Sequence, residues 1–462
     1  MDQSFSRTSR ARASEFSFLI GMVVLVALPV ALFYPGLMNN DSLLIYGNAL
    51  DGGPASDWNS PFLVYLWRAL LWLGLNAAAF TLLQSAIYAL PLGWLLARAG
   101  LDPLPRLAVL SLILALPPTL TWLATLEKTT MTACLLCACF AVATALETAR
   151  HGKWLFHVLL ALALIGVFTR PNGILFFAPV VAYTAWRQSR VQGRWWTAAV
   201  VTAFLITAIG LPMMASSLGA VERHHPEQEF FALDLMNLSM AAGRDLLPEG
   251  ALTVPLEAAV AVMLEQPFPP FGGRFSVMSL RLNGMLPYVS DDTAVRSLRL
   301  AWINALETRS WDYVRYRLAL FWEFNCFDFG TVCYDSWHWY TGGIDLPNRF
   351  GLESHAVPSV FKFYRGLAGS VFYRPYAHAL ATLTLLVLAL RLRKPLVAAF
   401  AAILLVNYLS YLLILPGISA RMAIPLGLMI PVLTIGLFIR ADAVRGLVAM
   451  EPEVGLKDHD TA

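Results

Sequence analysis

The apolar residues of this chain come in long blocks, and this feature limits its possible folds more than any other. A helix that crosses a bilayer needs about 20 mostly apolar residues, because every backbone amide must be satisfied within the segment. Charged residues make up only 14% of the 462 residues, against about 25% in ordinary soluble domains. The sequence therefore predicts an α-helical polytopic membrane protein. The net charge of +3 does not indicate a nucleic-acid partner.

The apolar blocks predict a bundle of about ten transmembrane helices. The expected spans are residues 16–34, 77–97, 104–122, 129–147, 154–169, 173–186, 196–216, 376–391, 395–415 and 422–439. Alternation of these spans puts every basic loop cluster on one side, and the positive-inside rule makes that side the cytoplasm. These clusters are Arg7/Arg10/Arg12, Arg98/Arg106, Arg150/Lys153, Arg187/Arg190/Arg194, Arg391/Arg393/Lys394 and Arg440/Arg445. The N-terminus is expected in the cytoplasm. The scarcity of lysine beside arginine indicates a GC-rich bacterial genome, and the expected location is the bacterial inner membrane.

The predicted topology divides the chain into four parts. Residues 1–217 form an N-terminal membrane module of about seven helices, whose first external loop (35–76) contains an amphipathic segment at 61–75 that is expected to lie at the interface. Residues 218–375 form an external, periplasmic domain that is mainly helical, with one helix through 298–324. Residues 376–445 add about three spans, and 446–462 form a cytoplasmic tail.

Ionisable residues gather at the predicted external ends of distant spans. They are Asp41, Asp57, Glu127, Lys128, Arg170 and Arg421, with Asn172 beside Arg170. Such residues are costly at a membrane and tend to be functional. A carboxylate can activate a hydroxyl as a general base, and cations can stabilise a departing phosphate.

Each of these residues also has a structural interpretation. Arg170 and Arg421 could reach lipid phosphates at the interface, and Lys128 could pair locally with Glu127. Asp41 could cap the helix that follows it. The restriction of the whole set to one side of the membrane favours a site.

Several short motifs carry a family resemblance. PGLMNNDSLLIYGNAL and DWNSPFLVYLW resemble the first external loop of bacterial GT-C-type glycosyltransferases, the group of the aminoarabinose transferases and protein O-mannosyltransferases. FTRPNGILFF and ISARMAIP are similar to later elements of that group. The resemblance implies a GT-C-like bundle with Asp41 as the catalytic carboxylate and Asp57 as a second acidic residue. It implies that Lys128, Arg170 and Arg421 bind the donor phosphate.

The resemblance also implies supporting roles for Glu127, Asn172 and Asn59. Asn59 and Ser60 stand where the related pattern has His-Pro, so a metal or donor contact made through that histidine would be absent here. Metal dependence stays open, with a divalent cation as the one candidate cofactor.

Other motifs leave their alternatives open. Cys326 and Cys333 could form a disulfide in an oxidising compartment or stay reduced. His224 and His225, with Glu222, Glu227 and Glu229, could bind a metal but are more simply solvated. The Asp-x-Asp at Asp458 and Asp460 lies in the tail, away from the other candidates. The aromatic residues Trp302, Trp311, Trp322, Trp337 and Trp339 could contact a sugar or acceptor, or form the domain core and rest on the membrane.

The function expected from this inventory is transfer of a sugar from a polyprenyl-phosphate donor to an acceptor hydroxyl at the external face. The acceptor would be a glycolipid, a polysaccharide or a protein, and membrane lipid is a further partner. A transporter or flippase of lipid-linked glycans is the alternative, since Pro117 and Pro118 could break a helix as transporters do. A non-catalytic assembly or sensor protein is the third.

Overall fold

The structure of the chain, a computed structural model, describes residues 2–148, 153–193, 195–265, 277, 280–281, 283–289, 291–327, 357–367, 369–414 and 420–439. Helices account for most of these residues. The described strands are β1 (Ala55–Ser56) and β2 (Val221–Glu222), which pair in parallel. They join the first loop to the start of the domain at 218–375, which is predicted to be external and for which we keep the name external domain.

Six of the described helices are long and apolar enough to cross a membrane. They lie in α1 (Asp2–Phe33), α4 (Ala77–Arg98), α7 (Lys128–Thr148), α10 (Trp195–Ser217), α20 (Pro395–Ile414) and η4–α21 (Ala420–Ala423 and Ile424–Phe438). A seventh span would combine α5 (Pro103–Ala115) with α6 (Pro117–Ala124), which are bent by 75°. The bend falls at Pro117, whose ring cannot continue a helix.

The predicted number of about ten spans is not confirmed. α8 (Lys153–Thr169) and α19 (Pro375–Arg391) are apolar but shorter than a usual span. α9 (Ile174–Gln192) ends in a segment with Arg187 and Arg190, and it is not among the six. The segments predicted at these places are helical.

The centre of the bundle is α7, which packs against α4, α8 and α21. Its sequence is rich in Ala, Thr and Cys, and Cys134, Cys137 and Cys139 are fully buried. Small residues let the backbones of membrane helices approach closely. The cysteines of this run therefore serve packing, as their apolar context predicts.

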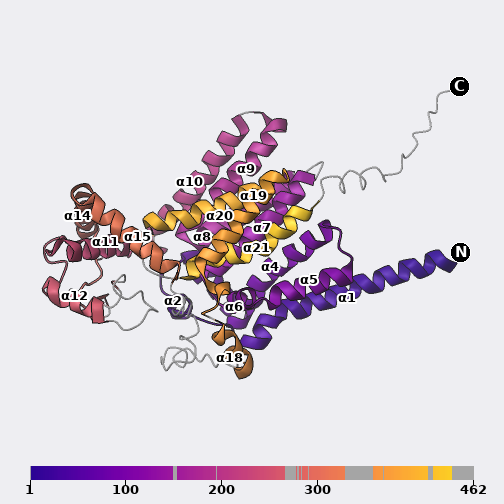
Figure 1. The fold of residues 1–462 in the computed structure, drawn as a ribbon, viewed down its shortest axis with the longest axis horizontal. Coiled ribbons are helices and arrows are strands. Elements are labelled where there is room, and N and C mark those ends of the chain that lie inside the picture. Colours follow the sequence, from indigo (N-terminus) through magenta and orange to yellow (C-terminus); the bar gives the residue numbers. More distant parts are fainter. Residues whose placement is uncertain are drawn as a thin grey trace.

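Figure 1 shows the bundle between the N-terminal end of α1 at the right and a group of external-domain helices at the left. This group contains α11 (Glu227–Ala242), α12 (Leu256–Glu265) and α14 (Asp292–Thr308). α15 (Ser310–Phe324) connects it to the bundle by packing on α20. The short helix α2 (Asn40–Asp51) of the first loop and α18 (Pro358–Gly366) lie below the bundle in this view. A second short helix of that loop, α3 (Pro61–Trp72), packs against α2.

The prediction of one helix through 298–324 is wrong. The chain leaves the helical conformation at Arg309, with φ −135° and ψ 38°, and α15 begins at Ser310. The break allows α14 to pack on α11 while α15 contacts both α11 and α20. Cys333, Trp337, Trp339 and the tail lie outside the described residues, so the disulfide remains a prediction.

Candidate functional site

The site begins where the chain leaves α1 and crosses the segment before α7. The backbone N–H of Leu37 donates to the carbonyl of Ala124 over 2.7 Å, and that of Leu126 donates to Leu37 over 2.8 Å. Gly36 permits this crossing, because its φ of +132° is rarely adopted by other residues and a Cβ there would lie 2.4 Å from Oγ1 of Thr81. The crossing brings the start of α2 beside the start of α7.

The first turn of α2 then directs Asp41 toward α7. Asn39 is the N-cap, and its side chain accepts from the backbone N–H of Ser42. Ser42 in turn donates its hydroxyl to the carbonyl of Leu126. Because Asn39 caps the helix, the proposed capping role of Asp41 is wrong, and the Asp41 carboxylate is available to other partners.

Four charged side chains meet here, and we call Asp41, Glu127, Lys128 and Arg421 the charge cluster. Oδ2 of Asp41 lies 3.1 Å from Nζ of Lys128 and 3.2 Å from a terminal nitrogen of Arg421. The other terminal nitrogen of Arg421 lies 3.4 Å from Oε1 of Glu127. Lys128, Asp41 and Arg421 keep 19%, 23% and 27% of their side chains exposed, so the cluster is open on one side. Glu127 forms its buried floor.

Arg170 is linked to the charge cluster through Thr129. It is buried at the N-terminus of η1 (Pro171–Gly173) and donates to Oγ1 of Thr129 over 3.3 Å. Thr129 donates to Oε1 of Glu127, also over 3.3 Å, and Arg170 contacts the sulfur of Met422, next to Arg421. The sequence did not indicate Thr129 or Met422, since neither residue type marks a site by itself.

Glu127 has a second carboxylate oxygen without a partner. Among the described residues, its Oε2 is buried and has no hydrogen-bond partner. Such atoms are costly to bury unless water or a ligand satisfies them. The floor of the charge cluster can therefore accept a hydrogen bond that the protein itself does not supply.

The cations control the protonation of Asp41. Burial by itself would raise the pKa of its carboxyl, but Lys128, Arg421 and Arg170 together hold that pKa well below its ordinary value. The cluster thus stabilises the folded protein above about pH 4, and this contribution is lost only as the pH falls through the lowered pKa.

We expect Lys128→Gln to raise the pKa of Asp41, because it removes the closest cation while burial persists. The measurement is the infrared band of the protonated carboxyl as a function of pH, with Asp41→Asn identifying the band. In wild type the Asp41 band should be absent throughout the mildly acidic range, and in Lys128→Gln it should emerge at higher pH. An unchanged titration would show that Lys128 does not hold the pKa of Asp41 down.

Asp57, the other predicted catalytic carboxylate, has different partners. Its Oδ1 accepts the backbone N–H of His224 over 2.6 Å, and its own N–H donates to the carbonyl of Glu222 over 3.0 Å. Within the described part of the chain, Asp57 forms no ion pair or hydrogen bond with a residue of the charge cluster. Asp57 therefore fastens the first loop to the external domain at the β1–β2 pair.

We expect Asp57→Ala to loosen this connection by about 1–2 kcal/mol, since a hydrogen bond to a charged acceptor is lost at a half-exposed position. Hydrogen exchange of the backbone amides at 55–57 and 221–224 should accelerate by about one order of magnitude. Asp57→Asn is the matched control, because an amide oxygen can still accept from His224. Equal exchange rates in Asp57→Ala and wild type would show that Asp57 does not hold the first loop to the external domain.

The remaining predicted residues lie near the cluster or its supports. Ser60 caps α3 and donates to the carbonyl of Phe168 over 2.6 Å, which ties the first loop to the end of α8 two residues before Arg170. Asn59 is buried with its Oδ1 unpartnered among the described residues. Asn172 lies in η1 and is half-buried.

The described residues contain no group of three or more His, Cys, Asp or Glu that could hold a metal ion. His224 pairs with Glu222 at 3.3 Å, whereas His225 lies between Glu227 at 3.3 Å and Asp292 at 3.2 Å. The two imidazoles thus have separate carboxylate partners.

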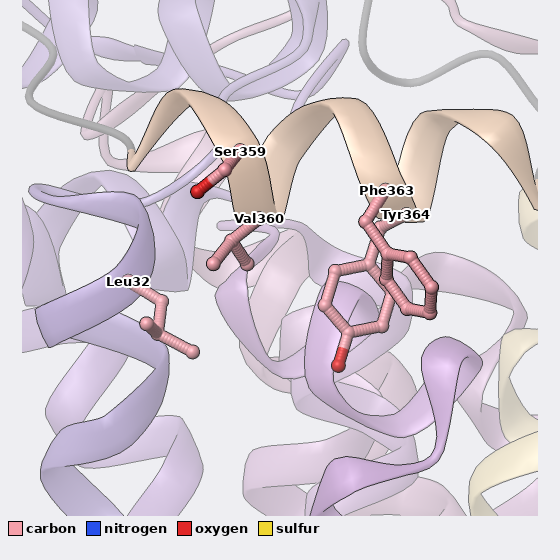
Figure 2. Close-up of a pocket in the computed structure, with 5 residues that line it drawn as sticks. All are labelled: Leu32, Ser359, Val360, Phe363 and Tyr364. Atoms are coloured by element: carbon pink, nitrogen blue, oxygen red, sulfur yellow. The ribbon is translucent and has the colours of Figure 1, made fainter.

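A shallow groove of about 300 Å³ lies between the C-terminal end of α1 and α18. Figure 2 shows Leu32 on one wall and Ser359, Val360, Phe363 and Tyr364 on the other. The lining carries no charged side chain, so this groove offers no counterpart to the chemistry of the charge cluster.

Comparison with protein-family models, curated proteins and solved structures found no match to this chain. Among the described residues, the fold and the site define a helical protein with six candidate membrane spans and a charge cluster where α2, α7 and η4 meet. The resemblance to GT-C-type glycosyltransferases rests on the short motifs of the sequence and stays a prediction.

Proposed function

We propose that this protein is a glycosyltransferase of the GT-C type, with about ten spans in a bacterial inner membrane. It moves a sugar from a polyprenyl-phosphate donor to an acceptor hydroxyl at the outer face. The observation that supports this most directly is the convergence of one carboxylate, Asp41, with Lys128 and Arg421 from segments far apart in the sequence.

In the proposed reaction, the acceptor oxygen attacks the anomeric carbon of the sugar while the bond from that carbon to the phosphate oxygen breaks. Asp41 takes the hydroxyl proton, and the polyprenyl phosphate leaves with the bonding electrons. Lys128 and Arg421 stabilise the negative charge on the departing phosphate. Attack from the face opposite the phosphate inverts the anomeric centre.

The ion pairs of the cluster suggest how the base becomes active. Without donor, Lys128 and Arg421 both bond Asp41, and this lowers the pKa of the carboxyl and makes it a weak base. A donor phosphate would draw these cations toward itself, because it offers more acceptor oxygens and a larger charge. The pKa of Asp41 would then rise when donor is present, which links proton transfer to donor binding.

The second candidate is a transporter or flippase of lipid-linked glycans. The 75° bend between α5 and α6 favours it, because transporters often use broken helices near their sites. The charge cluster, however, lies at helix ends rather than at helix midpoints. A transporter would need no general base.

The test is an assay of the wild-type protein in lipid nanodiscs with a panel of polyprenyl-phosphate sugars and hydroxyl acceptors. A glycosyltransferase releases polyprenyl phosphate and produces glycosylated acceptor, or hydrolyses the donor slowly when no acceptor is present. Movement of labelled donor across proteoliposomes with no chemical product would refute the transferase and establish the transporter. Absence of both activities across the panel would favour the assembly or sensor interpretation.

A further inference from the structure

One face of α15 is apolar and exposed along its whole length. Trp311, Val314, Leu318 and Trp322, which we call the α15 stripe, keep 75%, 42%, 52% and 58% of their surface accessible. Their spacing of three and four residues places them on one side of the helix. The opposite side buries Tyr316, Arg317, Leu320 and Phe324. The side of α15 that does not pack on the protein therefore carries an apolar stripe, unlike a helix surface that faces water.

The neighbouring helix α14 provides the contrast. Its exposed residues include Arg296, Arg299, Asn304 and Glu307, with Leu300 and Ile303 between them. This mixed surface is typical of a helix in contact with water. The two helices follow each other in the chain, yet only α15 presents a continuous apolar face.

The α15 stripe adjoins a candidate membrane span that has an exposed apolar face. α15 packs on α20, where the hydroxyl of Tyr313 donates to the carbonyl of Leu413 over 3.3 Å and the rings of Phe321 and Tyr408 lie 5.3 Å apart. α20 contains the candidate span Pro395–Leu413. Its exposed side chains Val406, Leu409 and Leu413 are 67%, 57% and 58% accessible. Figure 1 shows α15 beside the end of α20.

The composition of α15 matches the boundary between hydrocarbon and water. Tryptophan is enriched at this boundary because its ring is apolar and its N–H is polar, and the stripe has a tryptophan near each end. Arg315 is exposed beside the stripe, and its long side chain can extend to lipid phosphates while its methylenes stay in the apolar layer.

We propose that α15 lies in the plane of the external membrane interface, with the α15 stripe inserted among the lipids of the outer leaflet. If α20 spans the membrane, its exposed face contacts lipid. Because this face adjoins α15, the bilayer also covers the α15 stripe. This insertion fixes the height of α11 and α14 above the membrane. The inference does not depend on the proposed enzymatic activity.

Spin-label accessibility in lipid nanodiscs tests this placement. Single cysteines would replace each stripe residue, in a background with Cys326→Ser and Cys333→Ser, since the cysteines of α7 are fully buried. The control is Leu300→Cys, because Leu300 is 60% exposed on α14.

We expect the ratio of oxygen to nickel-chelate accessibility to favour oxygen at positions 311, 314, 318 and 322 and nickel chelate at 300. Nickel accessibility at the stripe equal to that at 300 would overturn the proposal. Low accessibility to both reagents would also overturn it and indicate a second protein copy over α15.

Photo-crosslinking of the unmodified protein provides a second measurement that needs no substitution. Lipids with a diazirine at the acyl chain should label peptides from α15 as well as peptides from α20, which is the internal positive control. Labelling of α20 without labelling of 311–322 would contradict the insertion of α15.

Discussion

Replacing Asp41 by asparagine is expected to lower the rate of sugar transfer by about 10²–10⁴-fold, the range typical for removal of a general base. The asparagine has nearly the same shape, so the helix cap at Asn39 and the crossing at Leu37 remain. It cannot accept the hydroxyl proton, and it no longer pairs with Lys128 and Arg421. The measurement is the rate of polyprenyl-phosphate release in nanodiscs at saturating donor.

Asp57→Asn is the control for this prediction, because Asp57 belongs to the same loop and its known partners are backbone groups of the external domain. It should change the rate by much less than Asp41→Asn. Full activity in Asp41→Asn would exclude Asp41 as the base. Loss of activity in Asp57→Asn alone would move the base to Asp57 and require a rearrangement of β1 and β2.

The helical membrane character was predictable from the sequence because bilayer thickness sets the length of apolar blocks. The break at Arg309 was not predictable, because the segment around it has continuous helical periodicity. What decides the break is tertiary packing, in which α14 contacts α11 and α15 contacts α20. The bend at Pro117 was anticipated only as an option, since proline permits both a kink and a helix start.

The charge cluster was predictable in part, because the apolar blocks that bilayer thickness defines also predict which loops share a side of the membrane. The predicted membrane topology places Asp41, Lys128 and Arg421 on one side of the bilayer, and the structure brings all three into contact. Topology predicts the side of the membrane on which a residue lies but not its position within the membrane plane. It therefore could not predict that Asp41, and not Asp57, contacts the cations. What distinguishes Asp57 from Asp41 is the backbone pairing of β1 with β2 beside Asp57. Strands of only two residues leave no recognisable pattern in the sequence.

The largest effect on stability is expected from Asp234→Ala in the external domain. Asp234 is fully buried, and its carboxylate lies 2.6 Å from Arg317 and accepts from the indole N–H of Trp302 over 2.8 Å. Arg317 is itself buried and lies over the ring of Phe230 at 4.7 Å. Removing the carboxylate leaves the guanidinium charge buried without its anion, which typically costs about 3–5 kcal/mol. Hydrogen exchange in α11 and α15 should then accelerate by about two to four orders of magnitude.

Asp312→Ala is the matched control, because Asp312 pairs with Arg309 at 2.9 Å in the same domain but both side chains are partly exposed, at 37% and 27%. An exposed pair contributes only about 0–1 kcal/mol, so exchange should change by less than about tenfold. Both variants remove one carboxylate from one arginine. A difference between their exchange rates therefore reports the effect of burial on the stability of the ion pair. Equal effects in the two variants would show that Asp234 does not hold α11 against α15. If Asp234→Ala accelerates exchange in α11 but not in α15, the indole of Trp302, rather than Arg317, is the partner that matters.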